Sequence, residues 1–455
     1  MVNGARPLGP RTLAARAEAA RAAEPALREA LAAGAVTGLS LLVPDPHGRF
    51  AAVDLDGRFV AEEVLDGGYG LCSYVFAWTL ERDALPIDAD GELAAYLGGY
   101  GDLRMRPDLA TLTPLSALPG DERAMAVVCD VEWPSGAPVL AAPRTVLAGQ
   151  LAALERIGLV PSAGIEHEVT FLDVEGNPLT AHGVDYAVGG TERMTPVLRT
   201  VRAALARAGL GVESARAECH PGQYEIVLRH RDALAACDDA MLQQSIVRAA
   251  AAEHGVTASY LAAPAPGQGS SCHVHLSLST VDGEGASSAG GTGLSAVLGS
   301  FLAGVLRDAR ALTALWAPGW NSYARLRGAP FSPLVLRWGV DDRTAAVRVA
   351  GQDRSLRLEF RFAGADAQPH LVVAALLAAG RAGIEDELPP PEPGRETGRL
   401  ASTPWDALQE LTSGRVAELL GTEVAAQQTA LLRAELDAGC DAVTEWQHRR
   451  AALRA

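Results

Sequence analysis

The segment IEHEVTFLD, residues 165–173, decides how this chain folds. Polar and apolar residues alternate along it, which predicts a β-strand that carries Glu166 and Glu168 on the same face. Taken alone, two acids on a strand are typical of a solvent-exposed face. Segments farther along the chain change this interpretation, because they also bring acids or imidazoles to one face of a separate strand.

Acidic and histidine side chains recur in three later segments: ECHPGQYEI (218–226), GQGSSCHVHLSL (267–278) and RLEFR (357–361). The side chains that these segments supply are Glu218, Glu225, His273, His275 and Glu359. Acids gathered on one sheet face would repel one another unless metal ions neutralised them. Five carboxylates and one imidazole suit hard ions such as Mg²⁺ or Mn²⁺ better than structural Zn²⁺.

Four arginines are interleaved with the last of these segments: Arg325, Arg343, Arg348 and Arg361. Guanidinium groups bind carboxylates and phosphates through paired hydrogen bonds. Together with divalent ions, they predict a site where a nucleotide's phosphate is transferred to an acid.

Composition excludes several classes of protein. All 39 basic residues are arginine, so the chain has neither the lysine of a phosphate-binding P-loop nor that of a pyridoxal Schiff base. The formal net charge of −16 argues against nucleic acid or an anionic membrane as the main partner. We expect no transmembrane helix, because no run of about eighteen apolar residues occurs. Six scattered cysteines favour a reduced, cytoplasmic protein.

The order of apolar patterns predicts an α+β protein of three parts. These are an N-terminal helix or extension (1–34), a small β-rich domain (35–140) and a larger catalytic domain with C-terminal helices (141–455). In the larger part, alternating strands and long apolar helices predict an antiparallel sheet that is covered by helices on one face. The other face would then be free for the acids.

These motifs resemble those of the glutamine synthetase family. Further matching segments follow in the family's order: GYGDLRMRPDLATL (99–112), APRTVL (142–147), NSYARL (321–326), WGVDDRTAAVR (338–348) and QPHLVVAALLAAG (368–380). The resemblance covers nearly the whole chain after residue 35. It implies a β-grasp-like N-terminal domain, a catalytic α/β domain, and a homo-oligomer whose active sites lie between adjacent subunits. The expected assembly is a dodecamer of two hexameric rings.

The resemblance also implies roles for individual residues. Two to three Mg²⁺ or Mn²⁺ ions would be held by two groups: Glu168, Glu218 and Glu225, and Glu166, His273 and Glu359. Glutamate would be gripped by Arg325 and Arg361, beside Gly269 and Gln268. Arg343 and Arg348 would stabilise the transferring phosphate, and ATP would contact His275, Ser277 and Arg357. Arg325, Arg343 and Arg361 are thus the expected catalytic residues.

The chain departs from the family where the amine acceptor would bind. Phe331 stands where ammonia-using members carry the glutamate that deprotonates ammonium, and Gln268 replaces an asparagine. This pattern resembles the branch of γ-glutamylamine ligases. We therefore expect an ATP-dependent ligase. It would activate the γ-carboxylate of glutamate as γ-glutamyl phosphate and transfer the γ-glutamyl group to a primary amine. A compact or aromatic amine fits better than a long polyamine, because no obvious acid cluster lies near Phe331 in the sequence.

Two alternatives stay open at this point. The chain could make glutamine from ammonia, with an acid supplied from elsewhere, and activity with ammonia against amines separates that case. It could also be a non-catalytic regulator on the same scaffold, and ATP turnover separates that case. The sequence names neither the amine nor the residue that deprotonates it.

Overall fold

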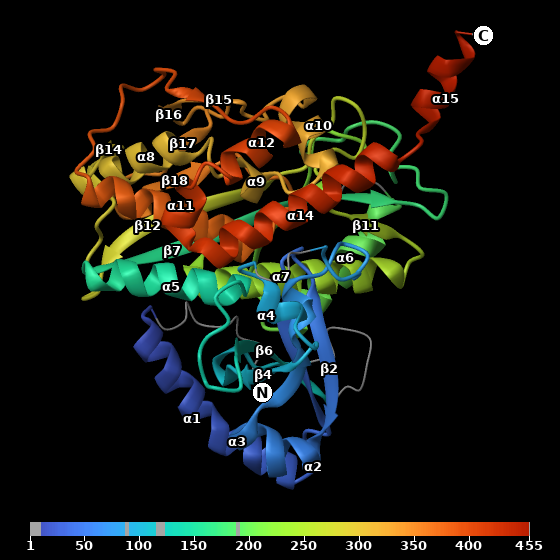
Figure 1. Cartoon of the computed structure of the whole chain (residues 1–455), viewed down its shortest axis with the longest axis vertical. Coiled ribbons are helices and arrows are strands. Elements are labelled where there is room, and N and C mark those ends of the chain that lie inside the picture. The colour runs from blue at the N-terminus through green and yellow to red at the C-terminus, as the bar shows by residue number, and fades with distance from the viewer. Residues whose placement is uncertain (1–10, 87–90, 115–122, 188–191, 455) are drawn as a thin grey trace.

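A computed structural model describes residues 11–86, 91–114, 123–187 and 192–454. The first ten residues of the expected N-terminal extension, 1–34, lie outside this description. Figure 1 shows a smaller N-terminal part, coloured blue to teal, below a larger part that holds the rest of the chain. Each part is built around its own β-sheet.

The N-terminal sheet has the strand order β2-β1-β6-β4-β3, with β5 paired to β6. Its strands are β1 (Gly38–Pro44), β2 (Phe50–Asp56), β3 (Tyr69–Cys72), β4 (Asp102–Pro107), β5 (Thr113–Pro114) and β6 (Met125–Glu132). β1 and β6 run parallel, whereas the other pairs are antiparallel. Three short helices, α2 (Gly57–Phe59), α3 (Leu65–Gly67) and α4 (Ala94–Leu97), and the long α1 (Leu13–Ala32) accompany this sheet.

The larger sheet has the order β16-β17-β18-β12-β7-β9-β8, with β10 and β11 also paired to β7. Its strands are β7 (Leu159–Leu172), β8 (Val212–Ala217), β9 (Gln223–Leu228), β10 (Arg231–Asp232), β11 (Thr257–Ser259), β12 (Cys272–Thr280), β16 (Trp338–Val340), β17 (Val347–Ala350) and β18 (Arg357–Phe360). Two small pairs, β13 (Ser288–Gly290) with β14 (Gly293–Leu294) and β15 (Val335–Leu336) with β19 (Gly398–Arg399), lie outside it.

The expectation of an antiparallel sheet is correct for the strands from β17 to β8 and wrong at one edge. There β16 and β17 run parallel. Residues 341–346 between them loop back through Asp341, whose φ is 51°, instead of closing a tight hairpin. Such a left-handed residue is uncommon outside glycine, which is why the strand pattern alone gave no sign of it.

Four apolar helices form the core with the larger sheet: α5 (Pro143–Arg156), α7 (Ala233–Ala252), α8 (Ala296–Asp308) and α11 (Pro369–Glu385). Two glycines let α8 and α11 cross closely, because a Cβ added to Gly383 would lie 2.6 Å from the Cα of Gly304. With one side of the sheet occupied in this way, polar side chains can gather only on the other side.

The remaining helices are α6 (Met194–Arg207), α9 (Thr313–Trp316), α10 (Trp320–Gly328), α12 (Pro404–Leu411), α13 (Arg415–Leu420), α14 (Thr422–Asp441) and α15 (Glu445–Ala452). α14 reaches the N-terminal part, where the hydroxyl of Tyr96 donates to Glu423 over 2.6 Å. α15 extends away from the body of the molecule in Figure 1. Among the described helices, none is long and apolar enough to cross a membrane.

A buried network of charges ties the two parts together. Arg16 of α1 reaches Asp108 over 2.6 Å and Asp238 of α7 over 2.9 Å. Arg144 of α5 also binds both acids, and Nε2 of His370 lies 2.9 Å from Asp238. We call these five residues the junction cluster. Because they come from five separate segments, α7 and four around it, they fix how the N-terminal part sits against the helices.

Candidate active site

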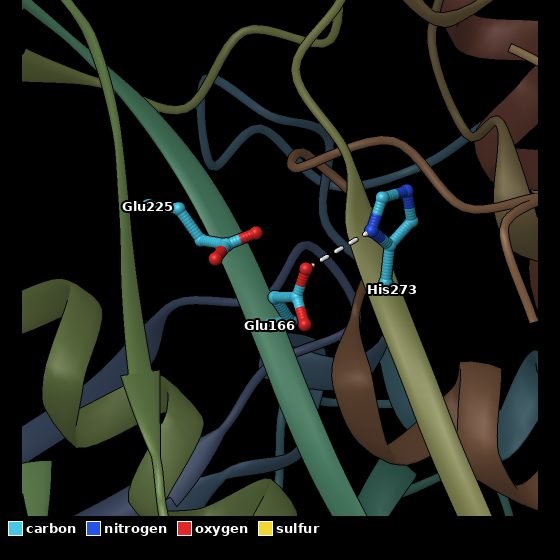
Figure 2. A group of neighbouring side chains, drawn as sticks. All are labelled: Glu166, Glu225 and His273. Atoms are coloured by element: carbon cyan, nitrogen blue, oxygen red, sulfur yellow. Dashed lines mark hydrogen bonds and ion pairs between the residues drawn. The ribbon is translucent and has the colours of Figure 1, made fainter. Parts of the chain in front are cut away.

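The register between neighbouring strands brings the acids of the larger sheet together. Glu166 of β7 lies opposite His273 of β12, and Glu168 of β7 lies opposite Glu225 of β9. Directly opposite residues share a sheet face and lie close together. Figure 2 shows the side chains of Glu225, Glu166 and His273 rising from three adjacent strands toward one another.

The next two strands of this face add another acid and an arginine. Glu359 of β18 lies opposite His275 on one side and Arg348 of β17 on the other. Nε2 of His275 lies 3.0 Å from Oε2 of Glu166, and Nδ1 of His273 lies 3.9 Å from Oε1 of Glu359. Acids predicted from distant segments therefore form one continuous group.

A cavity of about 480 Å³ opens over this face. Most of the residues expected at the site line it: Glu166, Glu168, Glu218, Glu225, Gly269, His273, His275, Arg325, Phe331, Arg343, Arg348, Arg357, Glu359 and Arg361. Gln268 and Ser277 do not line it. Ser277 stands two residues beyond His275 on β12, opposite Ser162, and Gln268 precedes the strand by four residues.

Several residues of the cavity wall were not expected from the sequence: Asp185, Tyr186, Arg216, Cys219, His220, Gln223, Ser271, Ala329, Pro330 and Ser332. A signal existed for Arg216, which precedes Glu218 by two residues and faces Glu225 across β8 and β9. No pattern marks Asp185 or Tyr186, because they belong to a turn between elements and not to a periodic strand or helix.

Three side chains offer a place for a divalent ion. Glu166, Glu225 and His273 each present one ligand atom, and these atoms lie within 4.8 Å of one another. Nε2 of His273 is buried and has no hydrogen-bond partner among the described residues. Carboxylate oxygens with one imidazole nitrogen match the ligand preference of Mg²⁺ and Mn²⁺. These residues therefore fit a metal ion.

The charges of the two glutamates support the same conclusion. Burial raises the pKa of Glu225 above its ordinary range, and the adjacent Glu166 raises it further. Burial alone would raise the pKa of Glu166 too, but hydrogen bonds with His273 and His275 outweigh it and hold that pKa well below its usual value. Two carboxylates this close cannot both stay ionised unless a cation lies between them.

Arginines neutralise part of the acidic charge. Arg216 binds Glu218 over 2.8 Å and Glu225 over 3.0 Å. Arg348 binds Glu359 over 2.8 Å, and Arg361 forms a further ion pair with Glu359. These pairs hold the acids in place, as the backbone N–H of Ser271 does when it donates to Glu168 over 2.6 Å.

Arg325 is held rigidly at the back of the cavity. It is only 1% exposed and donates to the carbonyls of Phe362 and Arg361 over 2.7 and 3.2 Å. Burial lowers its pKa to about 10, so the side chain stays positively charged at neutral pH. Position 269, beside Arg325, needs a glycine. A Cβ on Gly269 would lie 2.7 Å from the Cβ of Ala329, which is too close. A fixed cation beside an open backbone suits a bound carboxylate.

Phe331 lies at the mouth of the cavity. It follows α10 in a left-handed conformation, with a φ of 62°, and its side chain is 61% exposed. A bulky residue adopts this conformation only where the surrounding chain imposes it. The loop therefore presents an aromatic ring, and not a carboxylate, to the space above the acids.

The open sheet face, the acids that fit a metal ion and the arginines match one class of protein: an enzyme that transfers phosphate to a carboxylate. A family model for the glutamine synthetase catalytic domain matches residues 140–451. The gamma-glutamylethanolamide synthetase of Streptomyces coelicolor is 39% identical over 442 residues, which cover 93% of this chain and 94% of that protein.

Two further proteins are similar over most of the chain. A glutamate–isopropylamine ligase of a Pseudomonas species is 34% identical over 371 residues, covering 76% of this chain and 79% of that ligase. A solved structure described as apo GmaS without ligand superposes with a TM-score of 0.81 at 27% identity, covering 93% of this chain and 98% of the other.

The chain belongs to the glutamine synthetase family. It is an ATP-dependent ligase that joins a carboxylate to an amine, and divalent ions are part of the chemistry of its family. The resemblance that the motifs suggested is thereby confirmed, as is the α+β fold. A non-catalytic role has no support in these relatives.

Proposed function

We propose that this enzyme transfers the γ-glutamyl group of glutamate to a compact primary amine, and that Phe331 selects this acceptor. The enzyme joins the γ-glutamyl group to an organic amine, which distinguishes it from family members that use ammonia. The observation that carries the proposal is the aromatic ring of Phe331 at the mouth of the cavity.

The reaction has two steps. A γ-carboxylate oxygen of glutamate attacks the γ-phosphorus of ATP, and the bond to ADP breaks, so that γ-glutamyl phosphate forms. The amine nitrogen then attacks the carbonyl carbon, phosphate leaves with the bonding electrons, and the nitrogen loses a proton. An acyl phosphate is open to hydrolysis, so the cavity must exclude water between the two steps.

Arginines do most of the positioning. Arg325 and Arg361 bind glutamate beside the Gly269 backbone, because both are buried and one edge of each guanidinium, Nε, has no partner among the described residues. Arg343 and Arg348, which also line the cavity, stabilise the negative charge of the transferring phosphate. Each of these interactions strengthens as charge develops, which is what lowers the barrier.

The metal and nucleotide sites follow from the remaining side chains. Glu168, Glu218 and Glu225 would hold one Mg²⁺ or Mn²⁺ ion, and Glu166, His273 and Glu359 another, within a set of two to three ions. When bound, these ions neutralise phosphate charge. His275 and Arg357, whose ring and guanidinium nitrogens lie 3.3 Å apart, face the nucleotide. Gln268 and Ser277 do not line the cavity. Their proposed contacts, with glutamate and nucleotide respectively, would therefore form only at the edge of the site.

The acceptor preference rests on charge and size. A carboxylate would attract ammonium and remove its proton, whereas the ring of Phe331 offers apolar surface and a weak cation–π contact. Apolar surface suits the carbon body of an organic amine. The two relatives described above are named for ethanolamide and isopropylamine products or substrates, and both amines are compact.

The test is kcat/KM for ammonium, ethanolamine, isopropylamine and putrescine in the wild type, in Phe331→Glu and in the control Phe331→Leu. We expect the wild type and Phe331→Leu to prefer a compact amine. Phe331→Glu should shift the ratio toward ammonium by roughly 10- to 100-fold, the range of one charged contact. A wild type that prefers ammonium, or an unchanged ratio in Phe331→Glu, overturns the proposal.

We also propose the domain division 1–34, 35–140 and 141–455, and a cytoplasmic dodecamer of two hexameric rings. The separate sheets of the two parts support the division. The exposed Trp446 on the protruding α15 and the exposed Leu453 directly after it support contacts with other subunits. Light scattering tests the assembly, and a fully active monomer would contradict it.

A further inference from the structure

Six carboxylates line the catalytic cavity, and five of them are engaged by other groups of the chain. Those five are Glu166, Glu168, Glu218, Glu225 and Glu359, and each has an ion pair or a hydrogen bond with an arginine, a histidine or a backbone N–H. The sixth is Asp185. Within the part of the chain that the structure describes, no residue donates a hydrogen bond to Asp185 or forms an ion pair with it. Asp185 is also the one acid of the described lining that is not an expected metal ligand.

The turn that carries Asp185 is fixed against the end of β8 and the segment after it. A Cβ at position 183 would overlap the carbonyl oxygen of Cys219, so this close contact requires Gly183. The backbone N–H of Tyr186 donates to the carbonyl of Ala217 over 3.4 Å. Asp185 lies between these two contacts in the chain. Its place in the cavity wall is therefore set by the backbone on both sides of it.

Tyr186 and Phe331 share two unusual properties. Both line the cavity in the left-handed backbone conformation, with φ angles of 55° and 62°. Both residues are also largely exposed, at 69% and 61%. Large side chains take this conformation only where the surrounding chain imposes it, and such strained residues gather at ligand-binding sites. Two separate segments therefore hold an aromatic residue at the same cavity.

Tyr186 also connects the turn to the acids of the sheet. The guanidinium of Arg216 lies over its ring, 5.4 Å from the centroid, and Arg216 binds Glu218 and Glu225. Burial raises the pKa of Glu218, and the negative charge of Asp185 adds to that rise. The carboxylate of Asp185 therefore lies close enough to repel Glu218. A positive group bound at Asp185 would relieve this repulsion.

An ammonium ion with a carbon body matches what the cavity wall offers here. Asp185 presents carboxylate oxygens, which form strong hydrogen bonds with a positively charged donor. Phe331 presents apolar surface and the face of an aromatic ring. A divalent ion fits Asp185 less well, because such an ion needs several ligands. Asp185 does not belong to the described group of side chains whose ligand atoms lie together.

We propose that Asp185 receives the ammonium end of the acceptor amine, and that the carbon body of the amine lies against Phe331. This inference rests on the proposed function, because it places the acceptor in the catalytic cavity. Asp185 supplies the attraction for positive charge that an aromatic ring provides only weakly. The two segments thus divide the work: the turn before α6 binds the charge, and the loop after α10 contacts the carbon atoms.

A pair of amines of nearly equal size and shape tests the role of the charge. Ethylamine is a cation at neutral pH, whereas methoxyamine, in which an oxygen replaces the CH₂ group, is uncharged. The value of kcat/KM is measured for both in the wild type, in Asp185→Asn and in Asp185→Glu, with saturating ATP and glutamate. Glu213→Gln is the matched control, because it removes a charge from an exposed position of β8 that does not line the cavity.

We expect Asp185→Asn to lower kcat/KM for ethylamine relative to methoxyamine by roughly tenfold or more, which is the range of one hydrogen bond to a charged group. The loss should appear in the KM for ethylamine, while the KM for glutamate stays within about twofold of the wild type. Asp185→Glu, which keeps the charge, should retain most of the wild-type ratio, and Glu213→Gln should retain all of it. A purely structural role would lower the use of both amines alike.

An unchanged ratio in Asp185→Asn, or an equal loss for both amines, overturns the proposal. Should methoxyamine react too slowly to be measured, the two KM values decide, and a KM for glutamate that rises as much as that for ethylamine overturns it. The ratio compares a charged with an uncharged amine, so it does not depend on how the wild type ranks ammonium against organic amines. A wild type that prefers ammonium contradicts the proposed acceptor class, whereas an unchanged ratio contradicts only the role of Asp185.

Discussion

The junction cluster and the catalytic acids are both buried groups of charges, and they differ in how they are balanced. In the junction cluster, both oxygens of Asp238 meet positive or donor groups from Arg16, Arg144 and His370. Burial alone would raise the pKa of Asp238, but these partners outweigh it and hold the pKa well below its ordinary 3.8. On the catalytic face, the pKa of Glu225 is instead raised.

The difference separates charges that stabilise the fold from charges that await a ligand. Asp238 is satisfied by the chain itself, so its charge contributes to the native structure without any bound group. Glu225 and Glu166 face each other, and the chain leaves Nε2 of His273 without a partner among the described residues. Burial alone therefore does not indicate the role of these charged residues. What distinguishes them is whether groups of the chain itself neutralise their charge.

The strongest test of this contrast is Asp238→Asn. Removing one buried charge leaves Arg16 and Arg144 without a main counter-ion, so the free energy of unfolding should fall by about 3–5 kcal/mol. Chemical denaturation measures this loss. Because the pKa of Asp238 is held below 3.8, its contribution is present above that pH and is lost at lower pH. The difference in the free energy of unfolding between wild type and variant should therefore become smaller below pH 3.8. An equally stable variant would show that the junction cluster is not structural.

The second test is Glu166→Gln, on the catalytic side of the comparison. Loss of this carboxylate should lower kcat by roughly 10²- to 10³-fold, about 3–4 kcal/mol of transition-state stabilisation. The free energy of unfolding without metal should also fall, because the lowered pKa of Glu166 means that the fold stabilises its ionised form. The matched control is Glu175→Gln, an exposed glutamate in the turn after β7. Binding of Mn²⁺, measured by calorimetry, should weaken in Glu166→Gln alone, and full activity of this variant would contradict the metal site.

The third test reverses the usual sign of a substitution. Glu225→Gln should abolish activity yet stabilise the metal-free protein by about 1–2 kcal/mol, because it removes an acid that the fold holds protonated. The pKa of Glu225 in the folded state lies above its ordinary 4.5. Above pH 4.5 the unfolded chain releases this proton and the folded chain keeps it, so wild-type stability falls as pH rises. The advantage of Glu225→Gln should grow over the same range.

Thermal unfolding at pH 5 and pH 7.5, with a chelator present, measures this effect. Added Mg²⁺ should reverse it, because the ion stabilises the ionised wild-type pair and has fewer ligands in the variant. A variant that is less stable than the wild type at both pH values would mean that the two glutamates do not repel each other.

The smallest effect is expected outside both clusters. Arg381 and Glu385 form an ion pair one helical turn apart on α11, at 2.7 Å, with 21% and 46% of their side chains exposed. Arg381→Ala should change the free energy of unfolding by no more than about 0.5 kcal/mol, because solvent screens such pairs. A loss of unfolding free energy as large as that of Asp238→Asn would show that neither exposure nor the balance of partners decides how much an ion pair stabilises the fold.

Most of the residues expected at the site lie together in the structure, because strand periodicity is local. Alternation placed Glu166 and Glu168 on one face, and matching motifs on separate strands allowed the rest to be assigned. The structure brings fourteen of the sixteen expected residues to one cavity, all except Gln268 and Ser277. Those two were inferred from motif position alone, which does not say how far along a strand a cavity extends.

The junction cluster could not be predicted in this way. Arg16 pairs with Asp238, and a cavity separate from the catalytic one joins residues near 80 to residues near 435. Such contacts depend on how the two parts of the molecule pack against each other. The periodicity of a strand or helix carries no information about that packing. The turn that carries Asp185 and Tyr186 escaped for a related reason, since irregular segments have no pattern to read.

The position of Arg16 also bears on how the chain is made. Its partner Asp238 lies 222 residues later, so α1 leaves the ribosome long before the helix that completes its ion pairs. At roughly 5–20 residues per second, this delay is about 10–45 seconds. During that time α1 cannot make its native contacts with α7. Docking of α1 against α7 therefore waits until residue 238 has left the ribosome, 222 residues after Arg16.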